Sequence, residues 1–258
     1  MAVQAPDKVV ILARGMGSRM RRGDDSAGLD ERQAAVADSG VKALIPIDRP
    51  FLDYVLSTAA DAGYRRVCLV IGPEHDAVRK YYGQEAELRR LSVEFAVQEE
   101  PKGTANALLA AEEFVDGDTF AMLNSDNYYP LEAMRRLRDC VGLDGGVGLD
   151  GGVGLDGGVG LDGGVGLDGG AAAGVGLFDF DSMVSHSNLS EERLLAFSVG
   201  LVDAHGNLER IIEKPDIETW NALPRPIWIS MNCWQFRGSI FESCRAIGPS
   251  ARGEFELP

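Results

Sequence analysis

The sequence predicts an α/β fold in which a sheet carries helices on both faces. In the first half of the chain, short apolar runs typical of buried strands alternate with segments whose apolar residues recur every three or four positions. Such alternation is typical of parallel strands joined by helices. A length of 258 residues with 45% hydrophobic residues allows a substantial core, and we interpret residues 1–258 as a single domain.

Four strands and four helices are expected in the first half. The apolar runs place strands at 9–13, 67–71, 93–97 and 119–123. The helical patterns cover 52–62, 75–82, 105–114 and 131–140. Because ligands bind beyond the carboxyl ends of the strands in sheets of this kind, the loops after the first and fourth strands are candidates for a site.

The second half is expected to be richer in strands. Apolar runs predict strands at 173–180, 195–203, 208–212 and 227–236, with a turn at His205-Gly206-Asn207. We expect these strands to extend the same sheet and to form one wall of the site.

Residues 141–170 consist of the hexapeptide Val-Gly-Leu-Asp-Gly-Gly repeated five times without change. Three interpretations compete: a coil of a hexapeptide β-helix, a calcium-binding β-roll and a flexible insertion. The repeat matches six positions of the nine-residue calcium motif but lacks the apolar residue that packs the core of such a roll. Because glycine-rich copies bury little surface and lose much backbone entropy on ordering, we interpret the segment as a flexible insertion.

Charge and cysteine content limit the partners. The formal net charge of −15 disfavours a nucleic-acid backbone or an anionic membrane surface, and no apolar run is long enough to cross a membrane. The four cysteines contain no Cys-x-x-Cys pair and the three histidines lack ligand spacing, so buried free thiols are expected. These features predict a cytoplasmic enzyme without nucleic-acid or membrane partners.

A glycine turn follows the first predicted strand. In Arg14-Gly15-Met16-Gly17-Ser18-Arg19, the glycines allow backbone N–H groups to point at an anion, and Arg19 can add bidentate contacts to phosphate oxygens. A Gly-x-Gly after a strand is about as often only a tight turn. The turn therefore indicates a phosphate site only if other residues support it.

Three further groups of polar residues lie near predicted strands. Lys42 heads an apolar segment, Asp126 follows the strand at 119–123, and Glu213-Lys214 end another strand. A carboxylate at the position of Asp126 suits Mg²⁺, which takes few protein ligands and shares its shell with substrate phosphates. The structural alternatives are a solvated lysine at 42 and a helix cap at 126.

Together these motifs resemble the sugar-1-phosphate nucleotidyltransferases. They occur in the order found in that family, and the resemblance runs from about residue 9 to the end of the chain, with the repeat excluded. The segment 249–257 is most similar to the glucose-1-phosphate thymidylyl- and uridylyltransferase branch. The motifs are Leu12-Ala13-x-Gly15-x-Gly17-Ser18-Arg19-Met20, Lys42-Ala-Leu-Ile-Pro, Gln98-Glu-Glu-Pro-Lys-Gly103-Thr104-Ala105, Asn-Ser-Asp126-Asn and Glu213-Lys214-Pro215.

The resemblance implies a GT-A-like, Rossmann-related fold with a mixed sheet, and transfer of a nucleotidyl group from a nucleoside triphosphate to a sugar 1-phosphate with release of pyrophosphate. It implies Mg²⁺ held by Asp126 and allows a homo-oligomer. Catalytic roles fall to Arg19, Lys42, Asp126 and Lys214. By the same resemblance, the nucleotide is bound by Leu12, Ala13, Gly15, Gly17, Ser18, Arg19, Gln98 and Gly103, and the sugar phosphate by Glu213, Lys214 and Asn232.

The chain departs from the family pattern at several positions. Arg14 replaces a small residue, and its side chain could either contact a phosphate or crowd the base. Ser198 replaces a glycine that often approaches the sugar, so a different sugar preference is expected. The interval from Arg19 to Lys42 is longer than usual, and its Asp, Ser and Ala content indicates a flap that orders when nucleotide binds.

In the resembling branch, the segment similar to Gly253-Glu254-Phe255-Glu256-Leu257 leads into a second metal-binding aspartate, so we expect this chain to be incomplete at its C-terminus. A catalytically weak or inactive nucleotide-binding module is therefore an alternative function. A dinucleotide-dependent dehydrogenase is disfavoured because Met20 occupies the third glycine position of its motif. A glycosyltransferase is disfavoured because Ser125-Asp126-Asn127 lacks the Asp-x-Asp pattern.

Overall fold

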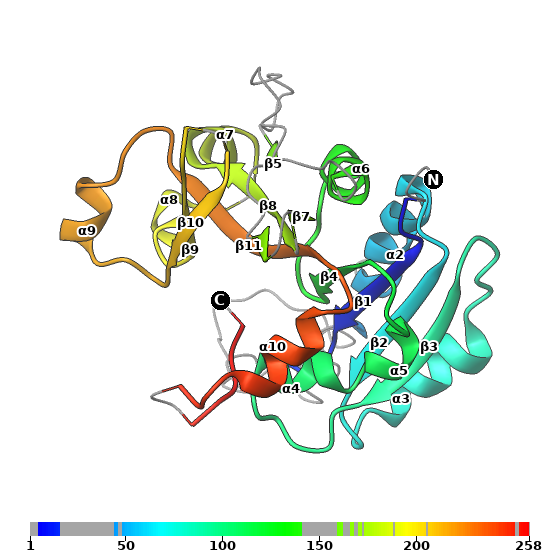
Figure 1. Cartoon of the computed structure of the whole chain (residues 1–258). Helices are drawn as coiled ribbons and strands as arrows, with labels where there is room; N and C mark the ends of the chain where they lie inside the picture. Colours follow the sequence, from blue (N-terminus) through cyan, green and yellow to red (C-terminus); the bar gives the residue numbers. More distant parts are fainter. Residues whose placement is uncertain are drawn as a thin grey trace.

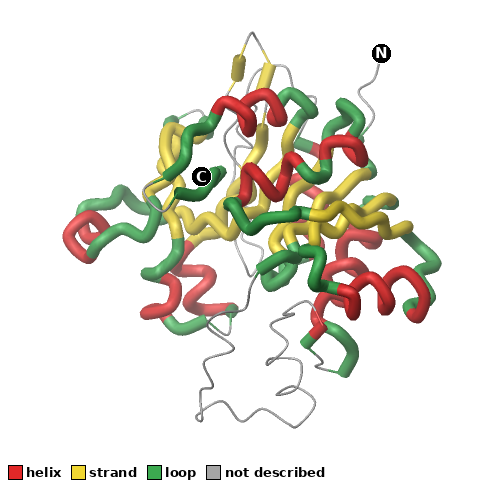
Figure 2. The backbone as a smooth tube through the Cα atoms, turned by 90° about the horizontal axis from the view of Figure 1, so that it is seen from below, coloured by secondary structure: helices red, strands yellow, loops and turns green. Residues whose placement is uncertain are grey.

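A mixed sheet forms the centre of the computed structural model, which describes residues 5–15, 44–45, 48–140, 159–161, 166–167, 170–171, 173–187, 189–204, 206–250 and 253–257. Within these residues the sheet has nine strands, seven of them in the order β10-β9-β11-β4-β1-β2-β3, with β8 and β5 off this path (Figure 1). Helices lie above and below the strand layer (Figure 2). The predicted α/β fold with a mixed sheet and helices on both faces is confirmed.

Four parallel strands form the half of the sheet built from the N-terminal part of the chain. They are β1 (Lys8–Leu12), β2 (Arg66–Ile71), β3 (Ser92–Val97) and β4 (Phe120–Asn124). β1 lies between β2 and β4, so that Val9 is opposite both Val67 and Ala121. These strands agree with the predicted ones to within one residue at each end. β1, β2 and β4 are buried on both faces and are therefore continuous apolar runs, whereas β3 at the sheet edge is partly exposed.

Successive residues of β1 divide between two cores, one on each face of the sheet. Val9 and Ile11 pack in the core covered by α2, α3, η2 and α6, whereas Val10 packs in the core covered by α4, α5 and α10. The alternation follows from the two-residue period of a strand. The bounds are α2 (Phe51–Ala62), α3 (Asp76–Lys80), the π-helical turn η2 (Tyr81–Glu85), α4 (Thr104–Leu109), α5 (Glu112–Val115), α6 (Leu131–Asp139) and α10 (Ile240–Ala246).

The second half of the chain extends the same sheet, as expected. β11 runs antiparallel to β4, with Trp234 opposite Met122, and also pairs with β8 and β9. β10 then pairs with β9 at the sheet edge. The strands are β8 (Ala173–Asp179), β9 (Ser198–Val202), β10 (Leu208–Ile212) and β11 (Trp228–Phe236).

Four short helices in this half were not predicted from the sequence: α10 and the three discussed here. These three are α7 (Phe180–His186), α8 (Glu191–Leu194) and α9 (Ile217–Asn221). Each begins after an Asp or Ser whose side chain accepts a hydrogen bond from a backbone N–H of the first turn, which is a common N-cap arrangement. Because α8 and the turn after it occupy residues 191–197, the strand expected from 195 begins only at Ser198. The helix expected at 105–114 is likewise divided into α4 and α5.

Most of the hexapeptide repeat lies outside the described residues. Within it, β5 (Val159–Leu161) pairs antiparallel with β8, and β6 (Gly166–Leu167) pairs with β7 (Gly170–Ala171). The flexibility of the insertion stays a prediction.

The four cysteines are free thiols, and all except the partly exposed Cys140 are buried. Burial raises the pKa of Cys68 to about 12 and that of Cys244 to about 11, so neither forms a thiolate readily at neutral pH. The expectation of free thiols is therefore confirmed. Among the described residues, no helix has both the length and the apolar character needed to cross a membrane.

Candidate functional site

The carboxyl ends of β1, β2, β3 and β4 meet at one edge of the sheet and are tied together there. The backbone N–H of Ala13 donates to Val70 O at 2.8 Å, that of Gln98 to Ile71 O at 2.9 Å, and that of Ser125 to Leu12 O at 3.2 Å. These hydrogen bonds continue the pairing of the strands beyond their ends, so the loops after the four strands are held in fixed positions relative to one another.

A cavity of about 390 Å³ opens at this edge and gathers most of the predicted nucleotide-binding residues. Gly17, Ser18, Arg19 and Lys42 lie outside the described residues, so their positions relative to this cavity are not part of the described geometry. The predicted site residues in its lining are Leu12, Ala13, Gly15, Gln98, Gly103 and Asp126.

Gly15 begins the glycine turn on the open side of the cavity. It is exposed, and a Cβ built on it would meet no other heavy atom of the described chain within 4 Å. The described residues therefore leave space beside the Gly15 backbone for a ligand that approaches the main chain closely.

Gln98 is a buried amide held in a single orientation. Its Nε2 donates to Gly103 O at 3.1 Å and to Asn106 Oδ1 at 2.9 Å. Since a backbone carbonyl only accepts hydrogen bonds, the nitrogen of the amide must face Gly103. Among the described residues, none donates a hydrogen bond to Gln98 Oε1, which leaves an acceptor at the cavity.

Gly103 has a backbone conformation that other residues rarely adopt, with φ of 103° and ψ of 177°. A Cβ at this position would also overlap the backbone of Phe255. That contact belongs to the segment 253–257, in which Phe255 N donates to Lys102 O at 2.7 Å and Leu257 N donates to Thr104 Oγ1 at 2.6 Å. The docked segment brings Glu254 and Glu256 into the lining of the cavity.

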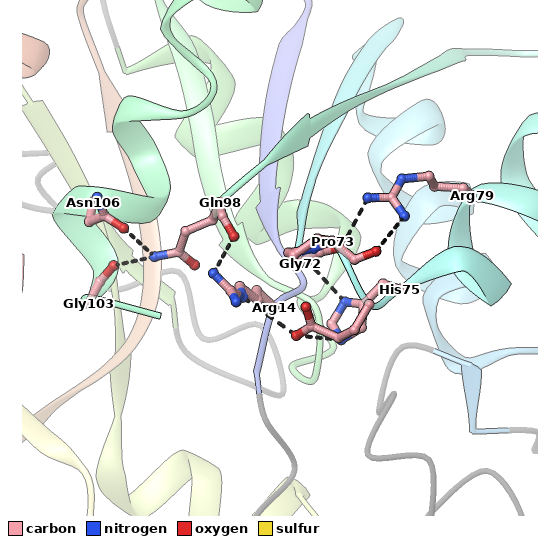
Figure 3. A network of polar contacts seen from close by, with 9 residues as sticks. Arg14, Gly72, Pro73, His75, Arg79, Gln98, Gly103 and Asn106 are labelled. Carbon is pink, nitrogen blue, oxygen red and sulfur yellow. Dashed lines mark hydrogen bonds and ion pairs between the residues drawn. The ribbon is translucent and has the colours of Figure 1, made fainter. Parts of the chain in front are cut away.

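The sequence analysis did not identify Glu254 and Glu256 as part of the site, nor the polar network around Arg14. Figure 3 shows Arg14 between Gln98 on one side and the loop from Gly72 to His75 on the other. Arg14 Nη1 donates to Gln98 O, and Arg14 Nε lies 3.6 Å from Glu74 Oε1. The sequence did offer one sign of this network: the loop after β2 lies at the same sheet edge as the glycine turn that contains Arg14.

Glu74 is ionised more readily than an ordinary glutamate. A hydrogen bond from its own backbone N–H lowers the pKa of Glu74, and the charge of Arg14 lowers it further, which together outweigh partial desolvation. Its carboxylate also lies 3.8 Å from His75 Nε2. The carboxylate is therefore a stable counter-charge for the guanidinium at neutral pH.

Asp126 follows β4, is exposed and lines the cavity. It also lines a second, more apolar cavity of about 600 Å³ beside α7 and the loop 127–130. The described residues contain no group of three His, Cys, Asp or Glu side chains arranged to hold a metal ion. The residues present therefore fit Mg²⁺ only if most of its ligands come from substrate phosphates and water, which is its usual mode of binding.

Glu213, Lys214 and Asn232 do not line the cavity at the parallel edge. Glu213 accepts a hydrogen bond from Ser198 Oγ, and Lys214 Nζ lies 3.5 Å from Glu213 Oε1. Lys214 and Asn232 both have positive φ, 43° and 55°. Such strained residues often lie at functional sites.

Tyr129 connects Asn232 to the loop that carries Asp126. Its hydroxyl contacts Asn232 O at 3.3 Å, Met231 O at 2.8 Å and Asn127 Nδ2 at 3.2 Å. Asn232 lies where the pairing of β11 with β8 is irregular, between Ser230 and Cys233. The structure thus joins Asn232 to the Asp126 loop through one buried tyrosine.

Comparison with known proteins supports the resemblance drawn from the motifs. Residues 34–144 match the family model described as Nucleotidyl transferase, a range that includes Lys42, Gln98, Gly103 and Asp126. The UTP–glucose-1-phosphate uridylyltransferase AglF of Haloferax volcanii is 24% identical over 97% of this chain and 80% of its own length. A glucose-1-phosphate thymidylyltransferase of Actinoplanes sp. is 28% identical over 96% of this chain and 64% of its own length.

The fold is also similar to a solved structure. The crystal structure of UDP-glucose pyrophosphorylase complexed with UDP-glucose superposes with a TM-score of 0.60 at 13% identity, and the match covers 97% of this chain and 83% of that one. At this identity the similarity shows the fold alone.

Proposed function

We propose that this chain, a distant member of the nucleotidyl transferase family, transfers a nucleotidyl group from a nucleoside triphosphate to a sugar 1-phosphate and releases pyrophosphate. One observation carries the proposal: six residues from three separate motifs line a single cavity at the carboxyl edge of the parallel strands. Nucleotides bind at this edge in sheets of this type.

The reaction forms a bond between a phosphate oxygen of the sugar 1-phosphate and the α-phosphorus, and breaks the bond between the α-phosphorus and the bridging oxygen of the leaving pyrophosphate. The attacking phosphate is already ionised, so no general base is required. Catalysis then depends on positioning and on stabilising negative charge. In this scheme Gly15 to Ser18 and Arg19 bind the triphosphate, and Lys42 stabilises charge on the α-phosphate and the departing pyrophosphate.

The orientation of Gln98 supports a uracil or thymine base. These bases carry an N–H on the pyrimidine ring, which suits the Oε1 acceptor that Gln98 presents at the cavity. Adenine instead carries an acceptor nitrogen at the corresponding edge. The names of the relatives from Haloferax and Actinoplanes, a uridylyl- and a thymidylyltransferase, are consistent with this proposal.

Asp126 would hold Mg²⁺ beside the phosphates. The ion would offset negative charge on the phosphates when bound. Glu213, Lys214 and Asn232 are proposed to contact the sugar and its phosphate from the antiparallel side of the sheet. Ser198 keeps the Glu213 carboxylate oriented for that role.

Pyrophosphate release tests this function directly. The protein is incubated with glucose 1-phosphate, Mg²⁺ and one of dTTP, UTP, GTP or ATP, and released pyrophosphate is measured. We expect release with UTP or dTTP in excess of that with ATP. Nucleotide binding without release from any of the four would instead support a catalytically inactive binding module, and absence of both binding and release would contradict the proposed site.

A further inference from the structure

We propose that Arg14 is a positioning residue that sets the preference of the nucleotide site for a pyrimidine base. The inference rests on the proposed function, because it assigns Gln98 to the base. Its basis is the network of Arg14 with Gln98 and Glu74, which joins the loops after three neighbouring strands (Figure 3).

The contacts of Arg14 direct it to the wall of the cavity. Its side chain is only 10% exposed, and its Nη1 donates to the backbone carbonyl of Gln98. Its Nε has no hydrogen-bond acceptor among the described residues, yet it lies 3.6 Å from the Glu74 carboxylate. A guanidinium that is buried and paired in this way is poorly placed to bind a phosphate, so of the two expected roles of Arg14 the structure favours the one at the base.

The partner of Arg14 is itself held firmly. Glu74 folds back against Gly72, where any Cβ would overlap its carboxylate. Arg79 Nη1 donates to Pro73 O and Nη2 to Gly72 O, each at 3.1 Å, which fixes the same loop from α3. Arg14 is therefore held by a loop that Arg79 stabilises. Through its hydrogen bond to Gln98 O, Arg14 fixes the main chain of Gln98 relative to this loop.

The N–H of Gln98 is bonded to Ile71 O, and two further contacts, one at the side chain and one at the main chain, set the position of its Oε1. α4 holds the side-chain amide through Gly103 and Asn106, and Arg14 holds the main-chain carbonyl. Loss of the Arg14 contact would leave the main chain at residue 98 held by the bond to Ile71 O alone, so the carbonyl could rotate, and it would open space at the wall of the cavity. Both changes act against uracil and in favour of the larger adenine, so the preference between the two bases should fall.

The test compares nucleotide affinities in the absence of sugar 1-phosphate, when no turnover occurs. Dissociation constants for UTP and ATP are measured by calorimetry with Mg²⁺ for the parent protein, Arg14→Ala, Arg14→Lys and Arg79→Ala. Arg79→Ala is the loop comparison, because it removes the support of the loop 72–75 while the hydrogen bond from Arg14 to Gln98 O stays in place. Thermal melting of each variant reports any loss of stability separately.

We expect Arg14→Ala to lower the ratio of UTP to ATP affinity about tenfold, the scale of one lost hydrogen bond from a charged donor. Arg14→Lys keeps one charged donor and should restore part of the ratio, whereas Arg79→Ala loosens only the loop behind Arg14 and should lower the ratio less than Arg14→Ala does. A purely structural role would lower the melting temperature and weaken both nucleotides equally.

An unchanged UTP to ATP ratio in Arg14→Ala would overturn the inference about Arg14 and leave the proposed function intact. If Arg14→Ala does not fold, Arg14→Lys decides, since a ratio equal to the parent's with one nitrogen in place of the guanidinium fork would show that the geometry of Arg14 is immaterial. If the parent binds neither nucleotide, the proposed function itself fails, and this inference fails with it.

Discussion

Gly103→Ala should destabilise the protein far more than the loss of one glycine normally does. Two costs add at this position. The backbone at φ 103° and ψ 177° lies in a region that only glycine occupies readily, which costs about 2 kcal/mol for alanine. The new Cβ would also overlap the backbone of Phe255, so the segment 253–257 must shift.

The second cost comes from the hydrogen bonds that hold this segment. Those from Phe255 N to Lys102 O, from Ala105 N to Phe255 O and from Leu257 N to Thr104 Oγ1 would lengthen or break. With about 1 kcal/mol for each hydrogen bond and partial replacement by water, the loss is about 1 to 2 kcal/mol. The total expected decrease in the free energy of unfolding is therefore about 3 to 4 kcal/mol.

Gly117→Ala provides the matched control. Gly117 also has positive φ, 76°, but a Cβ there would meet nothing within 4 Å, so only backbone strain of about 1 kcal/mol applies. The assay is urea unfolding of parent and variants, followed by circular dichroism and tryptophan fluorescence, with coincident transitions as the check for a two-state process. Equal destabilisation by the two substitutions would refute the reasoning, because it would mean that contact with Phe255 contributes nothing.

Four further predictions concern the site and the insertion. Lys42→Ala should lower turnover by about 10²-fold, the scale for one charge-stabilising contact, and a variant within a few-fold of the parent would remove Lys42 from the mechanism. Asp126→Ala should abolish Mg²⁺-dependent turnover, with circular dichroism as the check that the fold is intact; preserved turnover in excess Mg²⁺ would contradict its role. Ser198→Gly frees the Glu213 carboxylate and should change KM for the sugar 1-phosphate by about fivefold with the nucleotide KM constant, whereas equal changes in both would argue against a sugar contact. Deletion of four hexapeptide copies, residues 147–170, should leave folding intact as judged by circular dichroism, and an unfolded product would show that the repeat is structural.

The parallel half of the sheet was predictable from the sequence because three of its four strands, β1, β2 and β4, are buried on both faces. Val9 and Val10 point into different cores, so neither position tolerates a polar residue. The result is a continuous apolar run in the sequence, which predicts a buried strand. The unpredicted helices α7, α8, α9 and α10 are four to seven residues long, too short for a helical period to be read. For α7, α8 and α9, the capping Asp or Ser was the only local sign in the sequence that a helix begins there.

The candidate site was predictable only where its residues directly follow strands. Gly15, Gln98 and Asp126 meet because the carboxyl ends of parallel strands converge. The placement of Glu254 depends on hydrogen bonds between segments far apart in sequence, which no local pattern reports. The pairing of Glu74 with Arg14 likewise depends on the glycine at 72, whose missing Cβ lets the carboxylate fold back.

The docking of residues 253–257 on the Gly103 loop also determines when the cavity is completed during protein synthesis. Thr104 and its hydrogen-bond partner Leu257 are separated by 153 residues. At about 5 to 20 residues per second, a ribosome needs roughly 8 to 30 s to reach the second from the first. For most of that interval β1 to β4 have all been synthesised and can pair while one wall of the cavity is still missing, so a nascent chain would acquire the parallel half of its sheet well before its ligand site.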